Sequence, residues 1–259
     1  MLQAIKISKK YSREGAKSGY HDALSNVSAE FKENCVYALV GESGSGKSTL
    51  ARILSFIEFP TSGHVLLDGT DIKEYSRAEL RKKRSDIQLV MQDAESSLDP
   101  RQRITDILDE PLIHLANIAK GQRAGEKERL LQMVGLSDEI LLRLPKELSG
   151  GQQKRICIAR ALAANPKLII FDESFSGLDV TLRKQILDLL KELRTKLSCG
   201  YLIITHDLDV AMYMAEHILV MKNGEIVDRI INPKGFEDFT SPYAGQLVKA
   251  LLSKRHALQ

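Results

Sequence analysis

Alternating and continuous apolar segments predict the strands of this chain. Residues 2–11 and 21–32 alternate apolar and polar positions, which predicts two half-buried strands joined by the polar loop 12–19. Continuous apolar runs are typical of strands buried on both faces, as in parallel sheets. Short apolar runs of this kind occur at 36–40, 65–67, 87–91, 168–171 and 201–205. Two more strands, 218–221 and 225–227, flank an Asn223-Gly224 hairpin turn.

Helical spacing dominates the middle of the chain. Segments 104–108 and 129–134 have helical periodicity, and a third helix over 154–164 ends before Asn165-Pro166. A long amphipathic helix is predicted over 182–197, and the tail from Phe236 predicts a short helix. The apolar face of the helix over 182–197 comprises Leu182, Ile186, Leu189, Leu190 and Leu193.

The order of these elements predicts an α/β fold with an all-helical insertion. We expect one domain over 1–259, in which an α/β core with an antiparallel β part is formed by two separate segments. The expected boundaries are 1–91 and 166–232 for the core, 92–165 for the helical subdomain and 233–259 for the tail.

Composition limits the classes of function only weakly. The 259 residues are 43% apolar and carry a net charge of +3, which is too small to indicate a nucleic-acid partner. Cys35, Cys157 and Cys199 form no C-x-x-C pair, so neither a disulfide framework nor a zinc site is expected. No signal peptide is visible, and every apolar run is far shorter than the ~20 residues that cross a bilayer.

The glycine-rich segment 41–49 follows the first buried strand and fits the pattern G-x-x-x-x-G-K-[ST]. Such a loop wraps its backbone N–H groups around a phosphate, and the helix that follows adds partial positive charge. A flexible linker is the alternative, but a linker needs no Lys-Ser after its last glycine. The predicted nucleotide-binding residues are Gly41, Glu42, Ser43, Gly44, Ser45, Gly46, Lys47, Ser48 and Thr49, with Lys47 on the phosphates and Ser48 on Mg²⁺.

Two carboxylates follow the buried strand 168–171. A doubly buried strand can deliver its C-terminal acid to the carboxyl edge of a parallel sheet, beside the phosphate loop. We expect Asp172 to bind Mg²⁺ through water and Glu173 to activate the attacking water as general base. A strand-to-loop junction with solvated acids is the alternative.

The pentapeptide Leu148-Ser149-Gly150-Gly151-Gln152 precedes the helix that begins near Gln153. A serine and two glycines at a helix N-terminus predict a second anion site, and a simply capped helix is the alternative. The pentapeptide is identical to the signature of the ATP-binding cassette (ABC) ATPases, and the chain resembles that family over residues 2–232. The resemblance implies a P-loop NTPase core with a RecA-like sheet. It also implies head-to-tail subunit pairs in which Ser149, Gly150, Gly151 and Gln152 of one chain close over ATP on the other.

Other positions match the family pattern in order. The resemblance implies that Tyr11 stacks on adenine, that Gln92 touches Mg²⁺ or water, and that His206 contacts the γ-phosphate. The run 176–179, which ends in Asp179, matches the loop that crosses the dimer interface. Phe175 departs from the family, where relatives often have a small residue, and it is expected to affect the fine geometry of that interface.

Two segments indicate a branch of the family. Residues 92–101 and the tail segment 241–247 resemble bacterial importers of dipeptides, oligopeptides, nickel and metal–metallophore complexes. No cysteine follows Cys199, which favours the nickel or metallophore members over the peptide members. An accessory ATPase of a phosphonate-degrading complex is the alternative function.

The branch implies a set of partners. These are a second ABC ATPase subunit, two membrane permeases and an extracytoplasmic binding protein, with this chain peripheral at the cytoplasmic face of the membrane. Two different ATPase subunits are favoured, and an identical pair is left open.

Overall fold

The computed structural model describes residues 1–12, 19–91 and 97–256, and it divides into two compact units. The first unit combines Met1–Ser76 with Gly200–Gln259, and the second unit is the continuous segment Arg77–Cys199. The subdomain boundaries expected at 92–165 and 166–232 stay a prediction.

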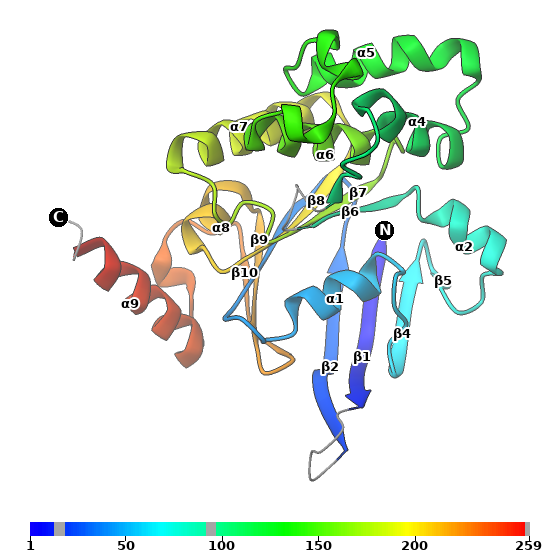
Figure 1. Cartoon of the computed structure of the whole chain (residues 1–259). Coiled ribbons are helices and arrows are strands. Elements are labelled where there is room, and N and C mark those ends of the chain that lie inside the picture. The colour runs from blue at the N-terminus through cyan, green and yellow to red at the C-terminus, as the bar shows by residue number, and fades with distance from the viewer. Residues whose placement is uncertain (13–18, 92–96, 257–259) are drawn as a thin grey trace. The chain divides into compact units, whose positions relative to one another are not determined.

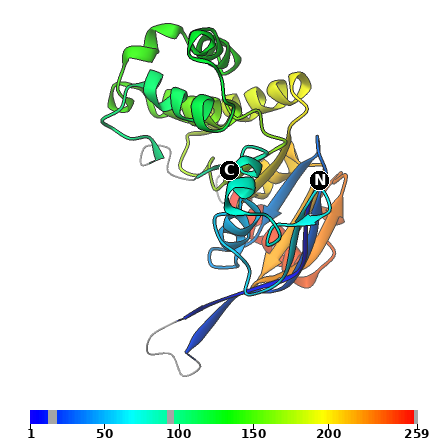
Figure 2. The same cartoon turned by 90° about the vertical axis from the view of Figure 1, so that its right-hand side faces the viewer.

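An antiparallel sheet opens the first unit. Its strand order is β2-β1-β4-β5, and β1 and β2 lie side by side in Figures 1 and 2. A bulge at Lys6, where φ is 47°, shifts the β1 register so that Ile7 as well as Ala4 is buried. The strands are β1 (Leu2–Ser12), β2 (Tyr20–Phe31), β4 (Ser62–Leu67) and β5 (Thr70–Asp71).

A mixed sheet forms the rest of the first unit's core. Within this unit its strands follow the order β10-β9-β3-β8, in which β9, β3 and β8 are parallel and β10 is antiparallel to β9. All residues of β3 are buried, as the continuous apolar run predicted. The predicted hairpin is present, with Asn223 at φ 49° and Gly224 at φ 80°. The strands are β3 (Val36–Val40), β8 (Gly200–Thr205), β9 (His217–Lys222) and β10 (Glu225–Ile231).

Helices α1, α8 and α9 complete the first unit. Helix α1 (Lys47–Leu54) follows the glycine-rich loop, and α8 (Leu208–Met214) follows β8. The sequence patterns did not predict α8. The tail holds a short 3₁₀ turn, η4 (Phe236–Asp238), and the 15-residue helix α9 (Pro242–His256), which is longer than expected.

The second unit is mainly helical. Its parallel strands β6 (Ile87–Val90) and β7 (Leu168–Asp172) pair from Ile87 opposite Leu168 to Val90 opposite Phe171. Helices α4 (Ile104–His114), α5 (Arg123–Met133) and α6 (Gly150–Leu162) pack on one another, as the insertion pattern predicted (Figure 1). The remaining elements are α2 (Arg77–Lys83), η1 (Lys120–Gln122), η2 (Asp138–Leu142), η3 (Pro145–Glu147) and α7 (Val180–Lys196).

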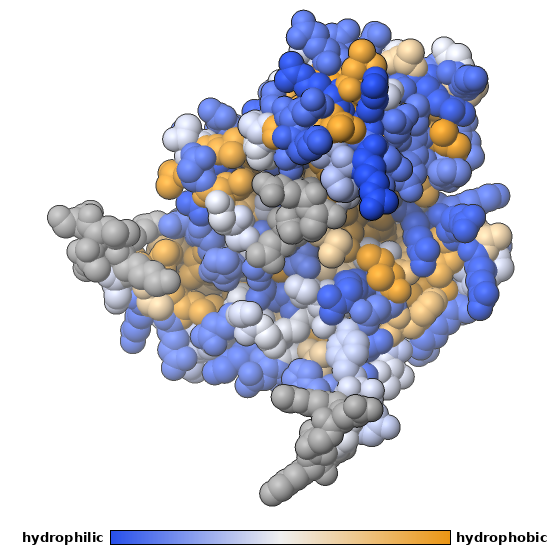
Figure 3. Space-filling model, viewed as in Figure 1, coloured by the Kyte–Doolittle hydropathy of each residue, from blue (hydrophilic) through white to orange (hydrophobic). Residues whose placement is uncertain are grey.

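The surface over α4 and α5 is mostly hydrophilic on the face shown in Figure 3. This matches α5, in which Leu130 and Leu131 are buried while most of the other side chains are polar. Across the described ranges, no helix has the length and apolar character needed to cross a membrane.

Candidate functional site

The parallel register in the first unit places two predicted site segments side by side. Val40, the last residue of β3, lies opposite Thr205, the last residue of β8. Gly41 and His206 therefore emerge from neighbouring strands at the same edge of the sheet. His206 is exposed there, and Asp207 caps α8 by accepting hydrogen bonds from Asp209 and Val210.

Lys47 holds the glycine-rich loop together from inside. Its ammonium group donates to the carbonyl oxygens of Gly41 and Glu42, both at 2.8 Å, and lies 3.4 Å from Ser45 Oγ. The side chain is only 3% exposed, so a full positive charge is buried in a shell of loop oxygens. An anionic ligand is the natural counter-charge for such a group.

The loop backbone adopts conformations that require glycine. Gly44 has φ 79° and Gly46 has φ 106°, and a Cβ at Gly46 would lie 2.5 Å from the Ala23 carbonyl oxygen. No atom lies within 4 Å of a Cβ position at Gly44, so a ligand can approach the backbone closely there. Helix α1 begins at Lys47 without a side-chain cap. This chemistry fits a phosphate group.

Tyr11 is half-buried on β1 and belongs to a charged cluster. Its hydroxyl donates to Glu58 Oε2 at 2.6 Å, and the Lys9 ammonium lies 5.1 Å from the ring centroid. Glu58 also pairs with Arg52 at 2.8 Å. Burial raises the pKa of Glu58, but hydrogen bonds from Tyr11 and Lys9 and the charge of Arg52 lower that pKa overall. The cluster fixes the Tyr11 ring, and its stacking on adenine stays a prediction.

The two parallel strands of the second unit also end side by side at their carboxyl edge. Val90 of β6 lies opposite Phe171 of β7, so Met91 and Asp172 follow side by side. Gln92 lies outside the described residues. Glu173 has φ 44°, a left-handed conformation that costs a non-glycine residue about 1 kcal/mol or more. Its carbonyl oxygen accepts hydrogen bonds from the Ser176 backbone N–H at 3.1 Å and the Ser176 hydroxyl at 2.7 Å, which hold the turn.

Two buried residues that the sequence analysis missed support this edge. The Ser174 hydroxyl donates to the carbonyl oxygens of Val90 at 2.7 Å and Met91 at 3.1 Å. The ammonium group of Lys154, on α6, is 3.4 Å from the Met91 carbonyl oxygen. The strand end that precedes Gln92 is therefore tied both to the turn after Asp172 and to the helix after the signature pentapeptide. The apolar pattern carries no signal for such side-chain bonds.

The signature pentapeptide forms a capped helix N-terminus. Ser149 Oγ accepts the Gln152 N–H at 3.3 Å, and Gln152 Oε1 accepts the Ser149 N–H at 3.0 Å. Helix α6 therefore begins at Gly150, earlier than the predicted start. Buried Gln153 was also missed, although its amide donates to the Pro145 and Leu148 carbonyl oxygens and thereby holds the preceding turn. Ser149 and Gly150 are exposed in their unit, and Gly151 is buried against Leu182.

Asp179 and Phe175 have clear local roles. Asp179 caps α7, with its Oδ1 accepting the Leu182 N–H at 2.9 Å. Phe175 is only 3% exposed, and its ring packs on Phe171 with a centroid distance of 5.5 Å. The bulky side chain that departs from the family pattern thus points into the core of its unit.

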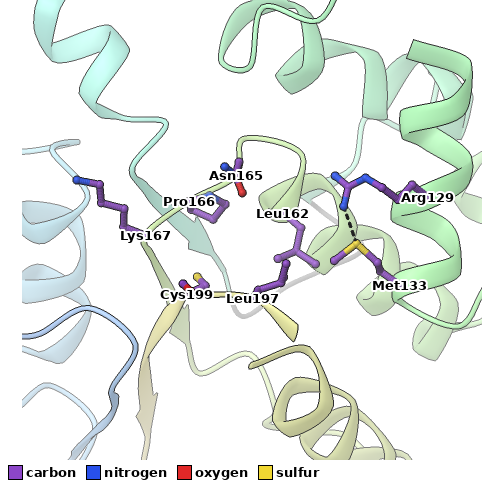
Figure 4. A pocket seen from close by; sticks show the side chains of 9 residues that line it. Arg129, Met133, Leu162, Asn165, Pro166, Lys167, Leu197 and Cys199 are labelled. Carbon is purple, nitrogen blue, oxygen red and sulfur yellow. Dashed lines mark hydrogen bonds between the residues drawn. The ribbon is translucent and has the colours of Figure 1, made fainter. Parts of the chain in front are cut away.

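A separate cavity of about 180 Å³ lies in the second unit, and it contains none of the predicted site residues. In Figure 4, Arg129 bonds Met133 and Lys167 points away from the other side chains. Cys199 lines the same cavity, and burial raises the pKa of its thiol to about 12.

In the part of the chain that the structure describes, no three His, Cys, Asp or Glu side chains gather as a metal site would require.

Comparison with known proteins gives consistent matches. A family model described as ABC transporter matches residues 24–176. The chain is 40% identical over 234 residues to the nickel import ATP-binding protein NikE of Rhodospirillum rubrum, covering 90% of this chain and 84% of that protein. It is 39% identical over 230 residues to the protein of the same name from Escherichia coli K12, covering 88% and 86%.

Solved structures resemble the chain over nearly its whole length. A dimeric ATP-binding cassette in a post-hydrolysis state, bound to ADP and Pi, superposes with a TM-score of 0.79 at 30% identity, covering 91% of this chain and all of that one. CbiO1 of Clostridium perfringens, part of the ABC transporter complex CbiONQ, has a TM-score of 0.79 at 29% identity and covers 99% of this chain and 97% of its own.

Proposed function

Because this chain belongs to the ABC transporter family, we propose that it is the ATP-hydrolysing subunit of a bacterial importer that takes up nickel or a metal–metallophore complex. Family membership confirms the resemblance on which the sequence analysis rested, and with it the α/β cassette fold and ATP as the nucleotide. Nickel as the cargo is supported by the names of the relatives at about 40% identity.

The observation that carries the ATPase proposal is the buried Lys47 ammonium inside a glycine loop at the end of β3, next to the strand β8 that ends just before His206. Lys47 and the N–H groups of the loop bind the phosphates of ATP, and His206 contacts the terminal phosphate. Glu173 accepts the proton of the attacking water. Tyr11 receives the adenine ring.

Mg²⁺ suits the oxygen groups that the chain offers. The Ser48 hydroxyl lies in the first turn of α1, and the half-buried Asp172 ends β7. Both are hard oxygen ligands of the kind that Mg²⁺ prefers, and Gln92 would supply another. A bound Mg²⁺ would neutralise phosphate charge.

The proposed working unit is a pair of such chains beneath two permeases, fed by a binding protein outside the membrane. The exposed Ser149 and Gly150 would complete the nucleotide site of the partner ATPase, which is proposed to be a different chain. The boundary of the helical part at 92–165 and a position at the cytoplasmic face of the membrane belong to the same proposal.

Affinity purification of the tagged chain from solubilised membranes of its host tests the proposal. We expect a multi-span permease to co-purify, and nickel-loaded binding protein to raise the ATPase rate of the reconstituted complex. Peptide-loaded binding protein should leave that rate unchanged. Co-purification of soluble enzyme subunits would favour the phosphonate-degrading complex, and stimulation by peptide would favour a peptide importer.

A further inference from the structure

The β9–β10 hairpin and helix α9 contact the glycine-rich loop 41–49, which is called the phosphate loop below. The Gly224 N–H donates to the Ser45 carbonyl oxygen at 2.9 Å, and a Cβ at Gly41 would meet the Met221 carbonyl oxygen at 2.2 Å. The Glu42 N–H donates to the hydroxyl of Tyr243 at 3.2 Å. The β9–β10 hairpin therefore restrains two points of the loop, and α9 restrains a third.

Tyr243 is itself firmly placed. It is 7% exposed, and the Lys222 ammonium lies 4.4 Å from its ring centroid. The Asp228 carboxylate accepts the N–H groups of Thr240 at 2.9 Å and Ser241 at 2.7 Å, and these bonds tie the start of α9 to β10. Helix α9 lies beside that strand in Figure 1.

We propose that Tyr243 is a positioning residue for ATP binding, because its hydroxyl fixes the first peptide group after Gly41 and so sets the resting shape of the phosphate loop. The inference rests on the proposed ATPase function. Burial raises the pKa of Tyr243, so its hydroxyl stays neutral at physiological pH. The C-terminal helix thereby becomes part of the nucleotide site, although it lies 201 residues from the loop in sequence.

The variant Tyr243→Phe removes the hydroxyl and keeps the ring beneath Lys222. We expect it to weaken ATP binding by about threefold to tenfold, the size of one hydrogen bond. The KM for ATP should rise by the same factor, while kcat at saturating ATP stays within about twofold. Amide hydrogen exchange at Glu42 should become faster in the nucleotide-free full chain. The control Tyr213→Phe, at a 41% exposed tyrosine on α8, should change none of these values.

A double-mutant cycle with Asp228→Ala separates positioning from general loosening of the tail. Asp228→Ala frees the start of α9 and should weaken ATP binding in the wild-type background. It should have little further effect once Tyr243 is Phe, because the contact through which it acts is already lost. Additive effects, or unchanged ATP affinity and Glu42 exchange in Tyr243→Phe, would overturn the inference.

The outcomes separate this inference from the proposed function. A wild-type chain that binds no ATP in calorimetric titration contradicts the ATPase function itself. A wild-type chain that binds ATP as tightly as Tyr243→Phe contradicts only the role of Tyr243. If Tyr243→Phe fails to fold, Asp228→Ala decides the matter, because unchanged Glu42 exchange in that variant counts against the inference.

Discussion

The phosphate loop and the signature pentapeptide both place glycines at the start of a helix, yet they are held in opposite ways. The loop at Gly41–Thr49 is bonded to distant segments, since its Ser45 carbonyl oxygen accepts the Gly224 N–H and its Glu42 N–H donates to the Tyr243 hydroxyl. The pentapeptide is restrained within its own turn, where Ser149 and Gln152 bond each other.

The glycine loop and the signature pentapeptide also differ in how far their side chains are exposed to solvent. Lys47 is 3% exposed and bonded inside its loop, whereas Ser149 and Gly150 are exposed in their unit. The loop binds its lysine inside a backbone cradle, whereas the pentapeptide presents its serine and first glycine at the surface of its unit. A helix N-terminus alone therefore does not define a site. What decides its use is whether the rest of the molecule closes around it.

The largest difference between the two regions is expected from glycine-to-alanine substitutions, one in each region. Gly46→Ala forces a Cβ to within 2.5 Å of the Ala23 carbonyl oxygen at φ 106°, so we expect a loss of about 1–3 kcal/mol in stability and no measurable ATP binding. Gly150→Ala meets no atom within 4 Å, so it should keep the fold and ATP binding. Thermal unfolding and calorimetric ATP titration of both variants check this. Equal losses in the two variants would contradict the contrast.

Glu173→Gln tests the chemistry at the second unit's carboxyl edge. We expect ATP to bind within about twofold of wild type, while hydrolysis slows at least about a hundredfold because the general base is lost. Steady-state phosphate release from the assembled complex measures the rate. The control Glu192→Gln lies at a 61% exposed side chain on α7 and should hydrolyse ATP normally. Near-normal turnover by Glu173→Gln would rule out its proposed role.

Elements with a local signal could be predicted from the sequence. The buried strands β3, β7 and β8 follow from continuous apolar runs, and the β9–β10 turn follows from Asn223-Gly224. The glycine loop, the carboxylates after β7 and the signature were found because each motif is contiguous. Their order along the chain was enough to identify the family.

Helix α8 has only seven residues and was missed because short helices carry little periodicity.

Contacts between distant segments could not be predicted. The bonds from Ser174 and Lys154 to the Met91 carbonyl oxygen join residues 63 to 83 positions apart. Tyr243 was noted only as part of a branch-specific segment, because nothing in its neighbours indicates that its hydroxyl reaches Glu42.

Ser149→Ala tests whether the signature serine does more than cap its helix. Loss of the cap should cost about 1 kcal/mol of stability and lower the hydrolysis rate of the assembled complex, while the isolated chain binds ATP normally. Ser137→Ala removes a cap of the same chemistry from η2 in the same unit, where Ser137 Oγ accepts the Glu139 N–H at 3.3 Å. It should cost similar stability without lowering hydrolysis. Equal hydrolysis rates in the two variants would mean that Ser149 acts only as a helix cap.

A small effect is expected at the buried Cys199 thiol, which lines the cavity of the second unit. Burial raises the pKa of the Cys199 thiol from 9.0 to about 12, so the unfolded chain ionises this thiol first. The thiol's contribution to stability is therefore complete below pH 9 and is lost as the pH rises toward 12. Thermal unfolding between about pH 7 and 10 should show a steeper decline for wild type than for Cys199→Ala, because the alanine variant has no thiol to ionise there. Parallel declines would mean that the thiol ionises equally in the folded and unfolded chains, which would contradict the burial of Cys199.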